Sequence, residues 1–254
     1  MIGKKIEPFK PLHDKNIDNY TDVITLLGQR GSGKTSVICN YLKYHDKDST
    51  ETKQRAKNIL YYSPTWRHDA TLQAAIQKIK TNVILTDKIS DLLSFIKIIS
   101  SDADEKQKRN GKKDFNIIAI DDSSGDNELI PPGQNKTPLV RAILASRHIN
   151  TSFIVALHRW NTFPTTARNV VNFVYLFKQN EDSLINFAKE SEFNRKAFLE
   201  IYNRYMKRDE GNRHDFLLLD FTNLDIYFNG TELVYSEGSD RVKKGVERGR
   251  GRSP

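Results

Sequence analysis

The protein has 254 residues, of which 37% are hydrophobic and 28% are charged, and its net charge is +8. This length and composition fit one α/β domain with its own packed core, and they exclude a chain that is disordered throughout. No apolar run reaches the roughly 18 residues that a membrane-spanning helix needs, and the amino-terminal segment lacks the apolar centre of a signal peptide. The single cysteine, Cys39, excludes an intrachain disulfide framework and a cysteine-rich zinc site. We therefore expect a soluble protein of an intracellular, reducing compartment.

Apolar runs of strand length alternate with helical patterns along the chain. The predicted strands are 23–27, 58–62, 82–85, 115–120, 152–157 and 172–177, and the predicted helices are 34–44, 70–79, 89–99, 139–146 and 192–208. This alternation is typical of parallel βαβ units, and strands without polar alternation are buried on both faces. We expect an α/β fold whose mostly parallel central sheet is flanked by helices. The polar residues 101–114 are expected to form an exposed excursion between two of these elements.

A glycine-rich turn, GQRGSGKTS, follows the first predicted strand and leads into the first predicted helix. It matches the G-x-x-x-x-G-K-[ST] pattern of phosphate-binding loops, and the alternative is an ordinary glycine-rich turn. Backbone N–H groups of such a loop surround a β-phosphate, which requires glycine where a side chain would collide or where φ is positive. Lys34 would carry positive charge to the β- and γ-phosphates, and Thr35 would offer a hydroxyl to Mg²⁺. The residues expected to bind the nucleotide are Gly28, Gln29, Arg30, Gly31, Ser32, Gly33, Lys34, Thr35 and Ser36.

Two acidic residues, Asp121 and Asp122, end the predicted strand 115–120. The carboxyl ends of parallel strands form the edge at which such sheets bind ligands, and this is the Walker B arrangement. We expect Asp121 to reach Mg²⁺ through water, and Asp122 to orient or deprotonate the water that attacks the γ-phosphate. A pair of acids favours hydrolysis, and the N-K-x-D motif that reads guanine in GTPases is absent. The alternative role for Asp122 is to cap a helix or a turn.

His158 ends the predicted strand 152–157, and several arginines surround it in the sequence. Beside the acidic strand, His158 would sense the γ-phosphate or its water; the alternative is a histidine that caps a strand. An arginine delivered to a neighbouring subunit's γ-phosphate can be worth roughly 10³ to 10⁵ in rate. We select Arg147 first and Arg168 second for this role. The alternative is that both are surface residues or partners of acids.

The carboxy-terminal part of the chain contains a turn signal and a basic tail. Asn229 and Gly230 lie between two alternating runs and predict a β-hairpin with a type I′ turn. We divide the chain into an amino-terminal extension (1–20), a P-loop ATPase domain (21–240) and a disordered basic tail (241–254). The tail carries six basic residues and one acid. It is either simply solvated or a flexible arm that contacts the phosphate backbone of nucleic acid.

Taken together, the motifs resemble a known family. They are GQRGSGKT, YYSPT at 61–65, IIAIDD, and ASRHINTSFIVALHRWNTFPTTARN. In this order and spacing they resemble the poxvirus-type genome-packaging ATPases of the FtsK-HerA superfamily, over residues 23–178. The resemblance implies a RecA-like P-loop NTPase core that assembles into a ring, a hexamer, and drives double-stranded DNA into a preformed capsid. FtsK and HerA proper usually carry Glu at the position of Asp122, and the family's sensor is commonly Gln where this chain has His158.

Our leading hypothesis is an ATP-hydrolysing DNA translocase that packages a double-stranded viral genome into a capsid. The expected cofactors are ATP and Mg²⁺, and the expected partners are double-stranded DNA, further copies of the chain, and capsid or portal-region proteins. The expected location is the host cell cytoplasm or the viral assembly site, with association to the virion. One alternative is a nucleotide or small-molecule kinase, which would release ADP only when its acceptor is present. Another is a DNA-binding scaffold that uses nucleotide for assembly alone.

Overall fold

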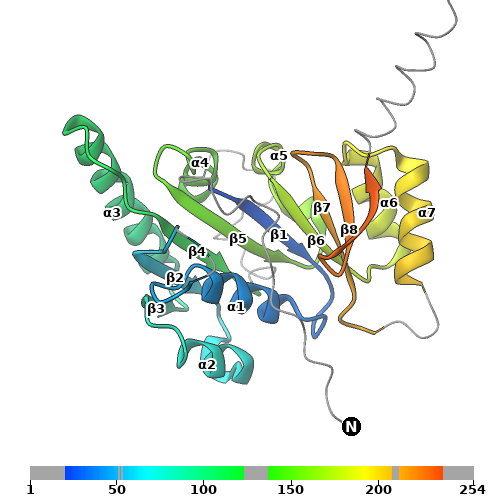
Figure 1. The fold of residues 1–254 in the computed structure, drawn as a ribbon, viewed down its shortest axis with the longest axis horizontal. Coiled ribbons are helices and arrows are strands. Elements are labelled where there is room, and N and C mark those ends of the chain that lie inside the picture. The colour runs from blue at the N-terminus through cyan, green and yellow to red at the C-terminus, as the bar shows by residue number, and fades with distance from the viewer. Residues whose placement is uncertain (1–20, 51, 53, 123–136, 208–211, 237–254) are drawn as a thin grey trace, which may run out of the picture.

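The computed structural model describes residues 21–50, 52, 54–122, 137–207 and 212–236, which form one nine-stranded mixed sheet with helices on both faces (Figure 1). The strands are β1 (Val23–Leu27), β2 (Asn58–Tyr62), β3 (Asn82–Thr86), β4 (Asn116–Ile120), β5 (Thr151–Leu157), β6 (Phe173–Phe177), β7 (Phe216–Asp220), β8 (Asp225–Phe228) and β9 (Glu232–Ser236). The α-helices are α1 (Lys34–Tyr44), α2 (Ala70–Ile76), α3 (Ile89–Lys108), α4 (Pro138–Leu144), α5 (Thr165–Arg168), α6 (Glu181–Glu190) and α7 (Arg195–Met206). Short 3₁₀ helices, η1 (Trp66–His68) and η3 (Trp160–Thr162), follow β2 and β5.

The strand order in the sheet is β3-β2-β4-β5-β1-β6-β7-β8-β9. Strands β1 to β6 pair in parallel, and β7, β8 and β9 continue the sheet in antiparallel pairs. Every residue of β1, β4, β5 and β6 is buried, which explains why these strands are apolar along their whole length. The α/β fold with a mostly parallel sheet is therefore confirmed. Because β5 lies between β1 and β4, the connections after these three strands meet at one edge of the sheet.

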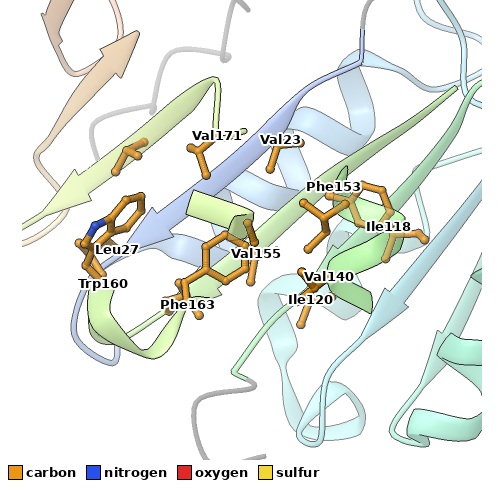
Figure 2. Close-up of a cluster of buried hydrophobic side chains, with 14 of the residues drawn as sticks. Val23, Leu27, Ile118, Ile120, Val140, Phe153, Val155, Trp160, Phe163 and Val171 are labelled. Carbon is orange, nitrogen blue, oxygen red and sulfur yellow. The ribbon is translucent and has the colours of Figure 1, made fainter. Parts of the chain in front are cut away.

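The two faces of the sheet carry separate hydrophobic cores. Ile24 and Leu26 of β1 point to the face that is covered by α1 and α2, whereas Val23 and Leu27 point to the face that is covered by α3 to α7. This alternation follows from the two-residue period of a strand. Figure 2 shows part of the second core, in which side chains of β1, β4 and β5 meet Val140 of α4 and aromatic side chains from the segment after β5. The two cores therefore bury both faces of the central strands and fix the positions of the strand ends.

Most residues of the predicted exposed excursion 101–114 are exposed, but its first half is helical, because α3 continues to Lys108. Ala103 extends the buried stripe of the helix by one turn. The side chain of Lys106 forms an ion pair with Asp102 four residues earlier, at 2.9 Å, which supports the polar end of the helix. The helix ends where Asn110 takes a positive φ of 53°. Composition alone marked this segment as a loop, although short-range ion pairs make a polar helix stable.

Two helices of the second half of the chain differ from expectation. Helix α6 was not predicted; its first turn is capped by Asn180, whose side chain accepts a hydrogen bond from the backbone N–H of Ser183. The predicted helix 192–208 is present as α7 but begins at Arg195, because Asn194 caps it in the same way. Both helices pack on the second core, and they place Phe187 and Phe198 in ring contact at 5.6 Å between centroids.

The predicted carboxy-terminal hairpin is confirmed as β8 and β9. Asn229 and Gly230 both have positive φ angles, 49° and 77°, as a type I′ turn requires. The backbone N–H of Thr231 donates to the carbonyl oxygen of Phe228 at 3.2 Å and closes the turn. The predicted amino-terminal extension (1–20) and basic tail (241–254) lie outside the described residues. None of the helices in the described part has the length and hydropathy that a membrane crossing requires.

Candidate functional site

The predicted phosphate-binding loop joins β1 to α1 at the carboxyl edge of the sheet. Gly28 has no room for a side chain, because a Cβ atom there would lie 2.6 Å from Oγ of Ser32 and 2.8 Å from Cβ of Phe177. Gly31 and Gly33 have φ angles of 74° and 105°, which residues with a Cβ rarely adopt. Gly33 is the residue directly before α1 and provides no side-chain cap, so the first N–H groups of the helix are available to an anion. The glycines of the loop therefore meet the two expected requirements: no space for a side chain at Gly28, and a positive φ at Gly31 and Gly33.

We expect Gly28→Ala to lower the free energy of unfolding by about 1–3 kcal/mol, because the new methyl group must displace the buried Phe177. The matched control is Gly111→Ala, where the nearest atom to a new Cβ lies at an ordinary 3.5 Å and φ is not positive. Urea denaturation of both variants measures the difference. Equal stability of the two variants would contradict the close approach of β6 to the loop.

Lys34 is buried at the start of α1, and its ammonium group is held by the loop itself. Its Nζ donates to the carbonyl oxygens of Gly28 and Gln29 at 2.7 and 3.0 Å. Burial lowers the pKa of Lys34, and the nearby carboxylates of Asp121 and Asp122 partly oppose this by raising it. The lysine thus lies between the loop and the acidic pair, where phosphate oxygens are the natural partners for its charge.

Thr35, at the start of α1, and Asp121, directly after β4, meet at the carboxyl edge of the sheet. The Thr35 hydroxyl donates to Oδ2 of Asp121 at 2.7 Å, and the hydroxyl of Tyr61, on β2, donates to the same oxygen at 2.6 Å. Burial raises the pKa of Asp121, although these two hydrogen bonds and Lys34 act to lower it. Two hard oxygen donors at hydrogen-bond distance suit Mg²⁺, which keeps several waters and takes few protein ligands. Among the described residues, no cluster of three or more His, Cys, Asp or Glu side chains offers an alternative metal site.

Asp122 and His158 face each other beside the loop. Oδ1 of Asp122 lies 3.4 Å from Nε2 of His158, and Nδ1 of His158 lies 3.0 Å from the carbonyl oxygen of Gly28. This contact exists because β5, which ends at Leu157, pairs with both β1 and β4. Asp122 also has a positive φ of 54°, a conformation in which Asp and Asn are better tolerated than most side chains. The predicted loop, acidic pair and histidine therefore form one site.

Two residues of this site were not predicted as functional. Tyr61 appeared only in a quoted motif, yet it bonds directly to Asp121. His214, just before β7, has its Nδ1 at 3.2 Å from the carbonyl oxygen of Ser32 in the loop. Because Arg213 donates from Nε to Nε2 of His214 at 3.2 Å, the proton of the neutral ring lies on Nδ1 and is donated to Ser32. Contacts between residues so far apart in sequence leave no local signal.

We expect His214→Ala to weaken ADP binding about two- to tenfold, because the loop loses one hydrogen bond that holds its backbone. His214→Asn keeps an N–H donor near the position of Nδ1 and should restore most of the affinity. Titration with a fluorescent ADP analogue measures both variants, and the melting temperature without nucleotide shows whether the fold is intact. If His214→Ala and the unchanged protein bind ADP with the same affinity, His214 does not support the loop for nucleotide binding.

The two predicted arginines lie away from the loop. Arg147 precedes β5, and Arg168 ends α5 shortly before β6, so both lie at the amino-terminal edge of the parallel strands. They line one cavity of about 730 Å³. Arg168 forms an ion pair with Glu190, and burial lowers its pKa. Arg147 is exposed. Within one chain the structure does not bring either arginine to the phosphate-binding loop.

The remaining predicted residues agree with their local environment. Gln29 and Arg30 are exposed at the tip of the loop, and Ser36 lies half-buried in the first turn of α1. Cys39 is buried one turn further along α1, and burial raises the pKa of its thiol to about 12. The thiol therefore stays protonated and belongs to the core.

Known proteins were compared with this chain. No protein-family model matches it, and no curated protein matches it. Its structure is similar to the DNA-packaging ATPase B204 of Sulfolobus turreted icosahedral virus, with a TM-score of 0.55, 14% identity, and coverage of 83% of this chain and 98% of that chain. The genome-packaging NTPase B204 of Sulfolobus turreted icosahedral virus 2, in complex with ATP-gammaS, gives a TM-score of 0.53, 18% identity, and coverage of 82% and 96%. ATPases 2 and 3 of EssC from Geobacillus thermodenitrificans give a TM-score of 0.53, 13% identity, and coverage of 89% and 43%. At these identities the likeness shows the fold, and the fold of this chain is that of the RecA-like P-loop NTPases.

Proposed function

We propose that this protein is an ATP-hydrolysing DNA translocase that packages a double-stranded viral genome into a capsid, and that it belongs to the poxvirus-type branch of the FtsK-HerA superfamily. The observation that carries the proposal is the single cluster formed by Lys34, Thr35, Asp121, Asp122 and His158 at one edge of the sheet. The strand β5 between β1 and β4 brings His158 to Asp122. Further support comes from the names of the similar structures, which include a DNA-packaging ATPase and a genome-packaging NTPase bound to an ATP analogue.

Each residue of the cluster has a chemical role in this proposal. The loop N–H groups and Lys34 bind the phosphates of ATP, and Thr35 and Asp121 hold Mg²⁺. The bound ion would neutralise charge that develops on the phosphate oxygens. Asp122 accepts a proton from, or orients, the attacking water, and His158 links that position to the carbonyl of Gly28. Tyr61 keeps Asp121 oriented toward Thr35.

Assembly into a ring, with six copies as in the resembled family, would complete the site. Arg147 and Arg168 lie at the opposite edge of the sheet from their own loop, at the far ends of strands that are about 20 Å long. If either of these two arginines acts on a γ-phosphate, that phosphate must then be bound by a neighbouring copy. Arg147 is the better candidate, because it is exposed and Arg168 is already paired with Glu190. Double-stranded DNA and capsid or portal-region proteins are the proposed partners, at the viral assembly site in the host cell.

Release of inorganic phosphate by the purified full chain tests the proposal. We expect Mg²⁺-dependent release of phosphate from ATP that linear duplex DNA increases, and ATP-dependent assembly detected by light scattering. The kinase alternative requires ADP formation to depend on an added acceptor, without free phosphate. The scaffold alternative requires DNA binding and assembly to survive in Lys34→Ala. A rate indifferent to DNA in a protein that stays monomeric with ATP would reject the translocase.

A further inference from the structure

Several connections at the amino-terminal edge of the parallel strands carry exposed basic side chains. They lead into β2, β3, β4 and β5, on the side of the sheet opposite to the phosphate-binding loop. We call residues 43–50, 52, 54–57, 78–80, 102–114 and 147 the basic edge. The carboxy-terminal end of α3, which belongs to it, projects beyond the sheet (Figure 1).

Hydrogen bonds join these connections into one surface although they are far apart in sequence. Buried Asp46 accepts from the backbone N–H groups of Lys47, Lys80 and Thr81, which ties the end of α1 to the start of β3. The backbone N–H of Lys57 donates to the carbonyl oxygen of Phe115 at 2.8 Å, which ties the start of β2 to the start of β4.

The last link joins the starts of β4 and β5. Nζ of Lys113 donates to the carbonyl oxygen of His148 at 2.7 Å, and the side chain of Asn150 donates to the carbonyl oxygen of Lys113 at 3.1 Å. The basic edge is therefore continuous across four neighbouring strands, from β3 to β5.

The excess positive charge of the described chain is concentrated at the basic edge. Its described residues include twelve Lys and Arg against six Asp and Glu, whereas all other described residues include fifteen of each sign. Ten of the twelve cations are exposed. Of all twelve cations, three pair with acids of the same edge: Lys57, Lys106 and Arg109. The other nine form no ion pair with any described residue. The described residues outside the basic edge are therefore neutral in sum.

The excess of positive charge does not continue further along the same side of the sheet. Beyond β5, the connections around β6 to β8 carry Glu190, Glu192, Asp220 and Asp225. Stabilisation of helix carboxyl ends explains some of the cations, such as Lys43 in the last turn of α1. It does not explain Arg55, Lys80 or Lys112, because these lie in connections outside the helices.

We propose that the basic edge binds the phosphate backbone of double-stranded DNA without reading its sequence. Four strands at about 4.8 Å spacing span roughly 14 Å, which equals the axial rise of about four nucleotide steps of a DNA duplex. Exposed lysine and arginine side chains without a shape-specific pocket are suited to phosphate contacts. None of the large exposed apolar side chains of the described residues lies within the basic edge, which disfavours insertion into a membrane. The choice of DNA as the partner rests on the proposed function. The existence of the basic surface rests only on the positions of the charged residues.

The test is a charge reversal of three exposed lysines without ion pairs, Lys47→Glu, Lys80→Glu and Lys112→Glu combined in the full chain. Their backbone hydrogen bonds remain available, so the fold should persist. The control combines Lys97→Glu, Lys189→Glu and Lys196→Glu, three exposed lysines outside the basic edge. Fluorescence anisotropy measures binding to a duplex of about 20 base pairs between about 50 and 200 mM salt.

We expect the edge variant to bind DNA at least about tenfold more weakly, with a salt dependence shallower by about two to three in the slope of log K against log salt. The control should lose much less, and Mg²⁺-dependent ATP hydrolysis without DNA should be the same in all three proteins. Equal losses in edge and control variants, or none in either, would overturn the proposal. So would an edge variant that loses binding to phosphatidylserine vesicles but keeps its DNA affinity. If the unchanged protein hydrolyses ATP but binds no duplex, both the translocase function and this surface are rejected. If the unchanged protein binds duplex DNA and the edge variant binds it equally well, only the surface is rejected.

Discussion

Lys34→Ala should reduce ATP hydrolysis by about 10² to 10³ in kcat, the scale seen when one group that stabilises transition-state charge is removed. The ammonium group is buried at the loop and held by the carbonyl oxygens of Gly28 and Gln29. The other cation of the loop, Arg30, is exposed at its tip, so Lys34 is the buried cation between the loop and the acid pair. ATP binding should weaken as well, because the same charge contacts the phosphates before and during the reaction. Initial rates of phosphate release at saturating ATP give the effect on kcat.

The loss in Lys34→Ala should be chemical and not a failure to fold. Burial lowers the pKa of Lys34 more than the two aspartates raise it, so the folded state gains little from this charge. The melting temperature of the variant should therefore stay close to that of the unchanged protein. Lys43→Ala, on the exposed side of the same helix, is the matched control and should hydrolyse ATP normally in the absence of DNA. A Lys34→Ala protein with a normal rate would exclude the proposed nucleotide site.

The parts of the site that were predicted depend on short stretches of sequence. A phosphate-binding loop needs glycines and a lysine at set intervals after a strand, so Gly28, Gly33 and Lys34 are recognisable without knowledge of the fold. Asp121 and Asp122 follow a buried strand, and the carboxyl edge of a parallel sheet is shared by all its strands. The prediction that these residues come together is confirmed, because it required only that the strands be parallel.

The parts that were missed depend on which strands are neighbours. Tyr61 reaches Asp121 because β2 pairs with β4, and His214 reaches the loop because β7 pairs with β6, which pairs with β1. Closeness in sequence does not mean closeness in space here: Arg147 and His158 flank the same strand, but the seven residues of β5 place them on opposite edges of the sheet.

Asp122→Asn should reduce hydrolysis by about 10² to 10⁴ while leaving ATP binding nearly unchanged. The substitution removes the negative charge and proton-accepting ability of the carboxylate but keeps its size. Asn also tolerates the positive φ of 54° at this position, so the variant avoids the backbone strain that Ala would introduce. Single-turnover phosphate release, together with titration of a fluorescent ATP analogue, separates the chemical step from binding.

The same substitution decides between the two roles considered for Asp122. If Asp122 serves only to shape the turn after β4, Asn is an equally good turn residue, and Asp122→Asn should keep its rate. If Asp122 activates water, Asn cannot accept the proton and the rate should collapse even though its amide oxygen can still approach His158. Asp122→Glu restores the carboxylate on a longer side chain and should recover part of the rate. Loss in Asn with partial recovery in Glu assigns the carboxylate to the reaction, because turn geometry alone would rank these two variants in the opposite order.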